Sequence, residues 1–332
     1  MVRSLWLYAP VYNQTRRACI FFLKVCRYRA ILRDMETPAF GPIEQLLLKP
    51  LTLAVPLSRA PVITLKESDT VDTALSCLGK HRILSAPVVS DNGPPGSWVG
   101  IIGYHNFLKS FGRDVDKKAF LKSTLKRVAE FSNEPNLGVN DQTTLLDCSS
   151  MLRARGTVHR LIVTGHNVTH IISQSDIVRY VHEHINDPAL EPIRNITIAA
   201  SGLGQRKPTT LSSSDTVYHA LTTMIQEKVK CLAIIDPSSG TLVGNFSESD
   251  MRGLGTNFLE KLTTPVGRFL AEFSPASLIT VSVRLNDTIA VLLTTLAVNR
   301  LHHVWIQDAD GHPAGIVTLT DILDLLFKIK PE

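Results

Sequence analysis

Three aspartates of this chain each follow a serine or threonine by three residues, at the end of a short apolar run. The three segments read HIISQSDIV (170–178), GNFSESDMR (244–252) and GIVTLTDIL (315–323). A carboxylate near a helix start can accept hydrogen bonds from the two adjacent hydroxyls of a ribose, and a hydroxyl beside the same helix N-terminus can donate to a phosphate. The spacing therefore indicates nucleotide binding, with simple helix capping as the alternative.

The predicted ribose ligands are Asp176, Asp250 and Asp321, and the predicted phosphate donors three residues earlier are Ser173, Ser247 and Thr318. A fainter copy of the motif, GIIGYHNFL at 100–108, has Gly103 and Asn106 at these two positions. Asparagine offers no charge-assisted hydrogen bond, which is typically the stronger kind. We therefore expect the site of this first copy to be weak or empty.

These motifs belong to a repeat that must position them. A second aspartate column lies upstream at Asp69, Asp141, Asp215 and Asp287, with intervals of 72, 74 and 72 residues. Each of these aspartates follows Ser or Asn and precedes an apolar run at helical spacing, which is typical of a helix start. A short β-rich run separates the two columns in every copy. The repeat therefore predicts strand, helix, strand, strand, helix, an α/β (α+β) unit.

A longer period groups unit one with unit two, and unit three with unit four. The tetrapeptide AEFS occurs at 129–132 and again at 271–274, each time between one unit and the next. A stretch rich in Pro, Gly and Asn reads as the linker between pairs, and one unit alone is marginal for burying a core. The expected boundaries are a basic tail at 1–40, units at 45–112 and 113–186, a linker at 187–207, and units at 208–257 and 258–328.

The G-apolar-apolar-Ser/Thr-x-x-Asp endings resemble those of cystathionine-β-synthase (CBS) domains, two of which form a Bateman module. Two modules in one chain, with His-Arg in the second unit, resemble the gamma-type regulatory subunit of AMP-activated and sucrose-non-fermenting-related protein kinases. The segments LVGNFSESDMRG and ILSAPVV are similar to the plant-type gamma-like members in particular. The resemblance covers residues ~45 to 328 and implies four CBS repeats arranged as two Bateman modules.

A column at the start of the middle strand supplies cations. The aligned positions hold His159-Arg160, Lys230-Cys231 and His302-His303, but Leu84-Ser85 in unit one. In gamma-type subunits these positions face a central channel and hold nucleotide phosphates, so the resemblance implies phosphate roles for His159, Arg160, Lys230, His302 and His303. Arg160 is permanently charged, whereas a histidine with the ordinary pKa of ~6.5 is mostly neutral at pH 7. We therefore expect a weaker phosphate contact at His303, which strengthens as pH falls.

The excess of positive charge is concentrated at the N-terminus. Residues 1–33 hold seven Lys and Arg and no acid, which leaves 28 basic and 30 acidic residues in the rest of the chain. A broad nucleic-acid footprint on the body is therefore not expected. The basic segment fits an organelle transit peptide, a disordered tail or an upstream extension before Met35, and these three readings stay open. Otherwise we expect a cytoplasmic or nuclear protein without a membrane span, whose five cysteines are reduced thiols.

No catalytic or metal-binding constellation accompanies the repeats. The histidines of HEH at 182–184 do not share a helix face, and no Ser-His-Asp or paired-carboxylate set is found. The leading hypothesis is a regulatory subunit, not an enzyme and without a cofactor, that binds AMP, ADP or ATP between CBS units. The alternative is a non-sensing scaffold that holds a kinase complex or a homodimer together. By resemblance, the partners are a Ser/Thr protein kinase catalytic subunit and a beta-type bridging subunit.

Overall fold

The structure is a computed structural model that describes residues 41–55, 62–93, 97–111, 116–129, 138–153, 160–164 and 168–328. The basic tail and His159 lie outside the described residues, so the structure says nothing of their predicted roles. Within the described ranges, no helix has both the length and the apolar character needed to cross a membrane.

The predicted α/β class is confirmed, and the predicted order of strand, helix, strand, strand, helix is found in units one, two and four, whereas a short 3-10 turn replaces the last helix in unit three. Unit one contains β1 (Leu65–Lys66), α4 (Val71–His81), β2 (Ser85–Val89), β3 (Trp98–Gly103) and α5 (Tyr104–Phe111). Unit two contains β4 (Gly138–Val139), α8 (Leu145–Leu152), β5 (Arg160–Thr164), β6 (Val168–Ser173) and α9 (Gln174–Glu183). Unit three contains β7 (Thr210–Ser212), α11 (Val217–Gln226), β8 (Cys231–Ile235), β9 (Leu242–Ser247) and the 3-10 turn η2 (Glu248–Met251). Unit four contains β10 (Ser282–Val283), α14 (Ile289–Val298), β11 (His303–Gln307), β12 (Pro313–Thr318) and α15 (Leu319–Lys328).

Each unit builds one three-stranded sheet with the same topology. The first strand runs parallel to the second, because a helix connects them, and the second and third strands form an antiparallel hairpin. The hairpin register shifts at the same place in every unit, for example between Val88 and Val89 and between Ile306 and Gln307. The four repeats in the sequence therefore form four sheets with the same pattern of hydrogen bonds between strands.

The first helix of each unit begins one residue after a threonine, not at the upstream aspartate. The hydroxyls of Thr70, Thr144, Thr216 and Thr288 accept from the backbone N–H three residues later, at 3.1–3.3 Å. In three units the aspartate instead accepts from the backbone N–H three residues before it, as Asp69 does from Lys66 at 2.8 Å. The aspartate column therefore stabilises the turn ahead of the helix, and threonine supplies the cap.

Connecting segments pack on units other than those expected from the sequence. Helices α6 (Lys117–Lys122) and α7 (Leu125–Ala129) fall within the expected unit two, yet Ser123 accepts a hydrogen bond from the backbone N–H of Val71 in unit one. Lys49 lies between α2 (Pro42–Leu47) and α3 (Leu51–Ala54), and its carbonyl accepts a hydrogen bond from the backbone N–H of Leu145 in unit two. The segment with α12 (Phe258–Lys261) and α13 (Val266–Phe273) likewise packs on unit three, where the backbone N–H of Val217 donates to the carbonyl of Thr264. Within each pair, connecting helices therefore pack on a different unit from the one to which the sequence boundaries assigned them.

The linker at 187–207 is folded against unit four. It forms η1 (Pro188–Leu190) and α10 (Glu191–Arg194), and its Leu190, Ile193 and Ile198 are almost fully buried. The backbone N–H of Ile198 donates to the carbonyl of Asp287 at 2.8 Å. The Pro, Gly and Asn content of the linker therefore reflects tight turns within a packed connection.

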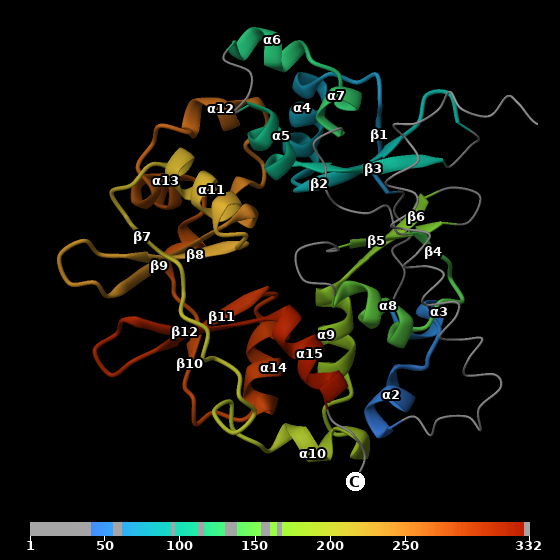
Figure 1. Cartoon of the computed structure of the whole chain (residues 1–332), viewed down its shortest axis with the longest axis vertical. Helices are drawn as coiled ribbons and strands as arrows, with labels where there is room; N and C mark the ends of the chain where they lie inside the picture. Colours follow the sequence, from blue (N-terminus) through green and yellow to red (C-terminus); the bar gives the residue numbers. More distant parts are fainter. Residues whose placement is uncertain are drawn as a thin grey trace, which may run out of the picture.

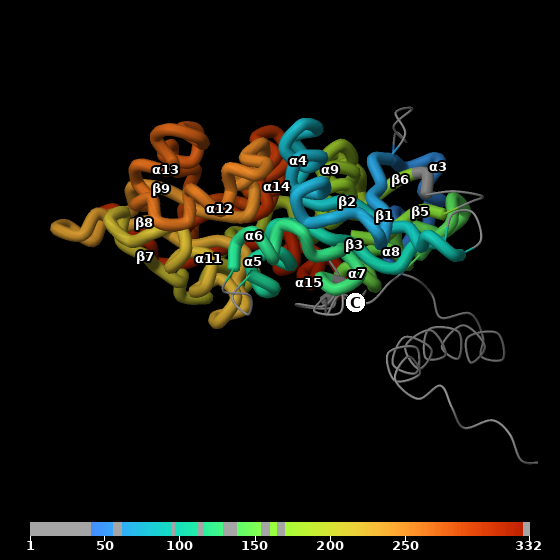
Figure 2. Tube along the Cα trace, turned by 90° about the horizontal axis from the view of Figure 1, so that it is seen from above, coloured from blue at the N-terminus to red at the C-terminus, as the bar shows by residue number. Residues whose placement is uncertain are grey.

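The four units surround a common centre. Figure 1 shows unit one (cyan) and unit three (orange) above unit two (green) and unit four (red), and Figure 2 shows that the body is flatter from the side than across its face. One hydrophobic core joins units one and three, and another joins units two and four. The sheets of units three and four meet through Cys231, Trp305 and Ile316, and Trp98 lies beside Gly138 where units one and two meet. Sheets thus join each pair, and helices join the two pairs.

Candidate nucleotide-binding site

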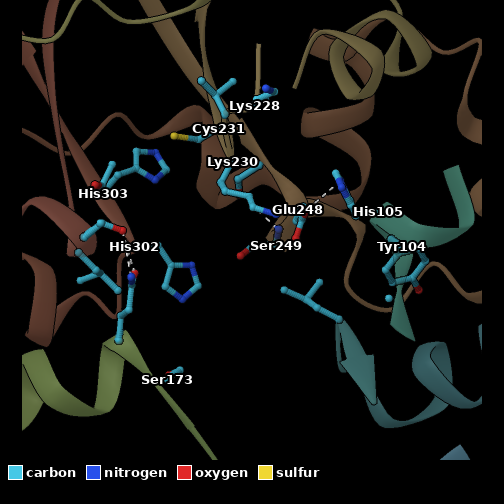
Figure 3. Close-up of a pocket in the computed structure, with 18 of the residues that line it drawn as sticks. Tyr104, His105, Ser173, Lys228, Lys230, Cys231, Glu248, Ser249, His302 and His303 are labelled. Atoms are coloured by element: carbon cyan, nitrogen blue, oxygen red, sulfur yellow. Dashed lines mark hydrogen bonds and ion pairs between the residues drawn. The ribbon is translucent and has the colours of Figure 1, made fainter. Parts of the chain in front are cut away.

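A cavity of about 480 Å³ lies where the four units meet, and residues from all four line it. Among the described lining residues, seven are Lys or Arg and one, Glu248, is acidic; the cations are Lys109, Arg160, Arg206, Lys207, Lys228, Lys230 and Arg252. His105, His302 and His303 also line the cavity, and Figure 3 shows His302 and His105 on opposite sides of it. Clustered cations in a concave, low-dielectric site raise the local concentration of anions. The cavity therefore suits a phosphate-bearing ligand.

The two predicted columns reach this cavity because the hairpin register places them opposite each other. Arg160 pairs with Ser173 across one hairpin, and His303 pairs with Thr318 across another. Ser247 lies opposite Cys231, and the adjacent Lys230 also lines the cavity. Every described residue that the sequence predicted as a phosphate ligand lines this one cavity: Arg160, Ser173, Lys230, Ser247, His302, His303 and Thr318.

The predicted ribose ligands Asp176, Asp250 and Asp321 are not among the residues that line the cavity. In each of the three motifs, one carboxylate oxygen accepts from both the backbone N–H and the hydroxyl three residues earlier, as Asp321 does from Thr318 at 2.8 and 2.6 Å. The same pair of bonds joins Asp176 to Ser173 and Asp250 to Ser247. In unit one the Asn106 amide oxygen accepts only the Gly103 N–H, at 3.0 Å. Capping therefore occupies one oxygen of each carboxylate and leaves the other for a second partner.

The second oxygen of Asp250 already has partners. Oδ1 accepts the Ser274 and Ser277 hydroxyls at 2.6 and 2.5 Å, next to the 3-10 turn η4 (Pro275–Leu278). With both oxygens bonded and the residue only 4% exposed, Asp250 presents no acceptor to a ribose in this structure. The expected ribose role of Asp250 therefore conflicts with the geometry, because the chain itself supplies the hydroxyls that a ribose would offer.

The other two ribose aspartates are held by arginines. Arg206, from the linker, donates to Oδ2 of Asp321 at 3.1 Å. Arg179 lies 3.4 Å from Oδ1 of Asp176, one turn along α9. Asp321 and Asp176 are both partly accessible, and partly exposed ion pairs of this kind contribute at most ~1 kcal/mol. Arg206 shares Oδ2 of Asp321 with Thr318, whereas Arg179 lies at the oxygen of Asp176 that does not take part in capping. A ribose can therefore displace Arg179 from Asp176 far more easily than it can displace the two serines from Asp250.

Sequence reasoning missed the contribution of unit one. Its strand position holds uncharged Leu84 and Ser85, but His105 and Lys109 on α5 face the cavity from the opposite edge of the unit. His105 Nδ1 lies 3.5 Å from Glu248, which also pairs with Lys230 at 3.5 Å (Figure 3). The basic linker residues Arg206 and Lys207 were missed as well, because a position in a linker gave no sign that it would reach the centre.

Burial keeps two cavity histidines neutral near pH 7. Desolvation and the neighbouring Lys230 lower the pKa of His105 to about 4, and desolvation followed by the nearby His302 lowers that of His303 to about 3. His303 Nε2 lies 2.6 Å from the Asn245 amide oxygen. As that amide is placed, its oxygen only accepts, so Nε2 donates and Nδ1 remains an acceptor. The prediction that phosphate binding at His303 strengthens between pH 7.5 and 6 assumed the ordinary imidazole pKa, whereas burial lowers the pKa of His303 to about 3 in this structure.

The depressed pKa of His303 predicts an acid-dependent loss of stability. Its folded pKa of about 3 lies below the unfolded value of ~6.5, so the unfolded chain takes up the proton first as pH falls. The stabilising contribution is complete above ~6.5 and is lost on the way to about 3, by about 2–3 kcal/mol at pH 4.5. Urea denaturation at pH 7 and 4.5 should show a smaller drop in His303→Gln than in the parent chain.

A matched control for this measurement is His312→Gln. The His312 side chain is 44% exposed, and its pKa is raised, first by its hydrogen bond to the backbone of Ser239 and then by Asp308. Its stabilising contribution therefore has the opposite pH dependence. If both variants lose the same stability on acidification as the parent chain does, His303 does not carry the effect.

Comparison with known proteins agrees with this geometry. The CBS-domain family profile matches residues 55–111, 128–183, 200–255 and 277–328, which together make up more than half of the chain. The chain belongs to the CBS-domain family. It is 21% identical to the SNF1-related protein kinase regulatory subunit gamma-like PV42b of Arabidopsis thaliana, over 80% of this chain and 91% of that protein. It is 24% identical to the 5'-AMP-activated protein kinase subunit gamma of Dictyostelium discoideum, over 82% of this chain but only half of that protein.

The fold is shared with a solved structure that this chain covers almost completely. Protein MJ1225 of Methanocaldococcus jannaschii, described as a proposed archaeal homologue of the AMPK gamma subunit, superposes with a TM-score of 0.64 and 16% identity, covering 83% of this chain and 99% of that one. The predicted membership in the CBS family and the similarity to gamma-type subunits are therefore confirmed. The four CBS domains and their mutual placement are shown by the profile matches and by this shared fold together.

Proposed function

We propose that this CBS-domain protein is a regulatory subunit that senses adenine nucleotides for a Ser/Thr protein kinase complex. The observation that carries the proposal is the central cavity, to which all four CBS domains contribute and in which seven Lys and Arg of the described chain face a single Glu. Charge of this kind selects phosphate, and similarity to gamma-type kinase subunits supports adenine nucleotides as the phosphate-bearing ligands. The role is binding, so regulation follows from different affinity for two states of the complex.

The residues divide between phosphate and ribose. In the proposed site, Arg160 binds phosphate with two parallel donors, and His302 and Lys230 bind beside it. The Ser173, Ser247 and Thr318 hydroxyls each donate their one proton to an aspartate in this structure, so each must turn from that aspartate to donate to a phosphate. Asp176 accepts from the ribose hydroxyls through Oδ1 once Arg179 moves aside, and Asp321 accepts through Oδ1, since Thr318 and Arg206 both contact Oδ2. Asp250 has a structural role, because its two oxygens are already saturated.

Calorimetric titration of the full chain with AMP, ADP, ATP and S-adenosylmethionine tests this function. At least one of the three nucleotides should bind saturably, and Arg160→Met should weaken its binding about 10- to 150-fold, as expected for the loss of charge-assisted hydrogen bonds. Lys118→Met is the matched control, because Lys118 is an exposed cation on α6 outside the cavity. S-adenosylmethionine has no phosphate and carries positive charge, so the basic cavity should reject it.

The second candidate function, a scaffold without a sensing role, predicts no saturable nucleotide binding in the same titrations. The partner proposal is tested separately by affinity purification from the native cell. We expect a Ser/Thr kinase and a beta-type bridging subunit to be recovered with the chain. Recovery of self-associated chain alone would favour a homodimeric scaffold.

A further inference from the structure

A second, smaller cavity of about 300 Å³ opens beside the central one. We call it the three-arginine pocket, because Arg179 on α9, Arg252 after η2 and Arg300 after α14 line it, from domains two, three and four. Its remaining polar lining includes Ser175, Ser249 and His302. Of these six residues, Ser175, Ser249, Arg252 and His302 also line the central cavity, so the two cavities adjoin at these side chains.

The three-arginine pocket holds positive charge with little internal compensation. Among the described residues that line it, there is no Asp or Glu. Arg179 has Asp176 at 3.4 Å, whereas neither Arg252 nor Arg300 is within ion-pair distance of an acid in the part of the chain that the structure describes. Arg160 and Arg252 both lower the pKa of His302, after desolvation, so their fields overlap at the boundary between the cavities. Converging guanidinium groups of this kind repel one another unless an anion lies between them.

Arg300 has an unusual backbone conformation at the C-terminal end of α14. Arg300 has a φ of 53°, in the left-handed region where Gly and Asn are usual. A cation after the last turn of a helix is favourable for the helix dipole, which accounts for one basic residue at the end of α14. That effect does not explain why arginines from two other domains face the same space.

We propose that the three-arginine pocket is a polyphosphate subsite, which takes the terminal phosphates of a nucleotide whose first phosphate lies in the central cavity. A phosphate chain that begins near Arg160 and His302 would pass Arg252 and end at Arg300 and Arg179. Guanidinium groups bind phosphate oxygens through paired donors, which makes them suitable for successive phosphates. The subsite favours nucleoside triphosphates and diphosphates over the monophosphate. The identity of the ligand as a nucleotide rests on the proposed function. The binding of a phosphate chain by the three arginines does not depend on that function.

The test uses Arg300→Asn, because Arg300 lines only the smaller cavity and Asn tolerates a positive φ. Titrations of the full chain at about 0.15 M ionic strength compare ATP, AMP and inorganic tripolyphosphate. We expect Arg300→Asn to weaken ATP binding about 10-fold or more and to change AMP binding by less than about twofold. Arg300→Lys keeps the charge without the paired donors, so its affinity for ATP should lie between those of the parent chain and Arg300→Asn. Arg268→Met, an exposed arginine on α13 outside both cavities, is the control.

The tripolyphosphate arm separates this inference from the proposed function. If the parent chain binds tripolyphosphate but no nucleotide, and Arg300→Asn weakens that binding, the subsite stands and the nucleotide function fails. If ATP and AMP both bind and Arg300→Asn changes neither ATP nor tripolyphosphate binding, the subsite is overturned while the function stands. Equal weakening of ATP and AMP would also overturn it, because the effect would not depend on the terminal phosphates.

Discussion

Replacing Gly315 by alanine is expected to lower the free energy of unfolding by about 3 kcal/mol, the upper part of the range for overpacking a core. A Cβ at Gly315 would lie 1.9 Å from the carbonyl oxygen of Gly204 and 3.0 Å from its carbonyl carbon. These are backbone atoms, and Gly204 is itself held at a φ of 77°, so they cannot rotate away as a side chain would. The linker would have to lift from the hairpin of CBS domain four.

Urea denaturation followed by circular dichroism measures this effect. Gly138→Ala is a matched control on β4, because a Cβ there meets nothing closer than 3.7 Å. Domain four is expected to lose its contact with the linker in Gly315→Ala, including the bridge between Arg206 and Ile316. Equal stability of the two variants would mean that the linker does not lie on the hairpin as the structure shows.

Asp250→Ala is expected to destabilise the chain by about 3 kcal/mol, whereas Asp321→Ala is expected to act mainly on nucleotide affinity. Removing the buried Asp250 carboxylate takes the acceptor from one backbone N–H and from the partly buried Ser247, Ser274 and Ser277 hydroxyls. Unmet buried groups cost about 1–3 kcal/mol each when water cannot replace the partner. Asp321 is more accessible and loses a cap and one partly exposed ion pair, worth about 1 kcal/mol each at most.

Parallel denaturation and AMP titration of the two variants distinguish these roles. Asp321→Ala should weaken AMP binding about 10- to 150-fold if its carboxylate binds the ribose. The control is Asn106→Ala in CBS domain one, which should do little to either quantity, because Asn106 accepts one backbone bond and carries no charge. If Asp250→Ala weakens AMP binding and leaves stability unchanged, the serines do not occupy that carboxylate in solution.

The position of the cavity gives ligand binding a means to affect the whole molecule. Helices join domain one to domain three and domain two to domain four, and the cavity lies at the meeting point of all four. Under the proposed function, an anion in the cavity would contact both Bateman modules at once, so its binding free energy would depend on how the modules are placed relative to each other. Such dependence is what a regulatory ligand requires, because affinity that differs between two arrangements shifts their populations.

The sequence was sufficient for everything that depends on local hydrogen bonding and periodicity. The order of the elements and the spacing of each aspartate from the hydroxyl three residues earlier involve residues within one repeat, and the alignment of Arg160 with His303 follows from comparing two repeats. Helix caps, hairpin register and alternation of apolar residues are set by neighbours a few positions apart, and these recur visibly in a repeated sequence.

Only the tertiary structure decided which of these residues remain available to a ligand. Ser274 and Ser277 reach Asp250 from the following connection, Arg206 reaches Asp321 across 115 residues, and His105 brings a titratable group from the domain that the strand column left uncharged. Burial of His303 against Asn245 likewise involves a residue 58 positions away. Identical motifs acquire different partners because the segments packed over them differ in sequence, and the free energy of a carboxylate or an imidazole depends on the groups that surround it in space, not on the motif that contains it.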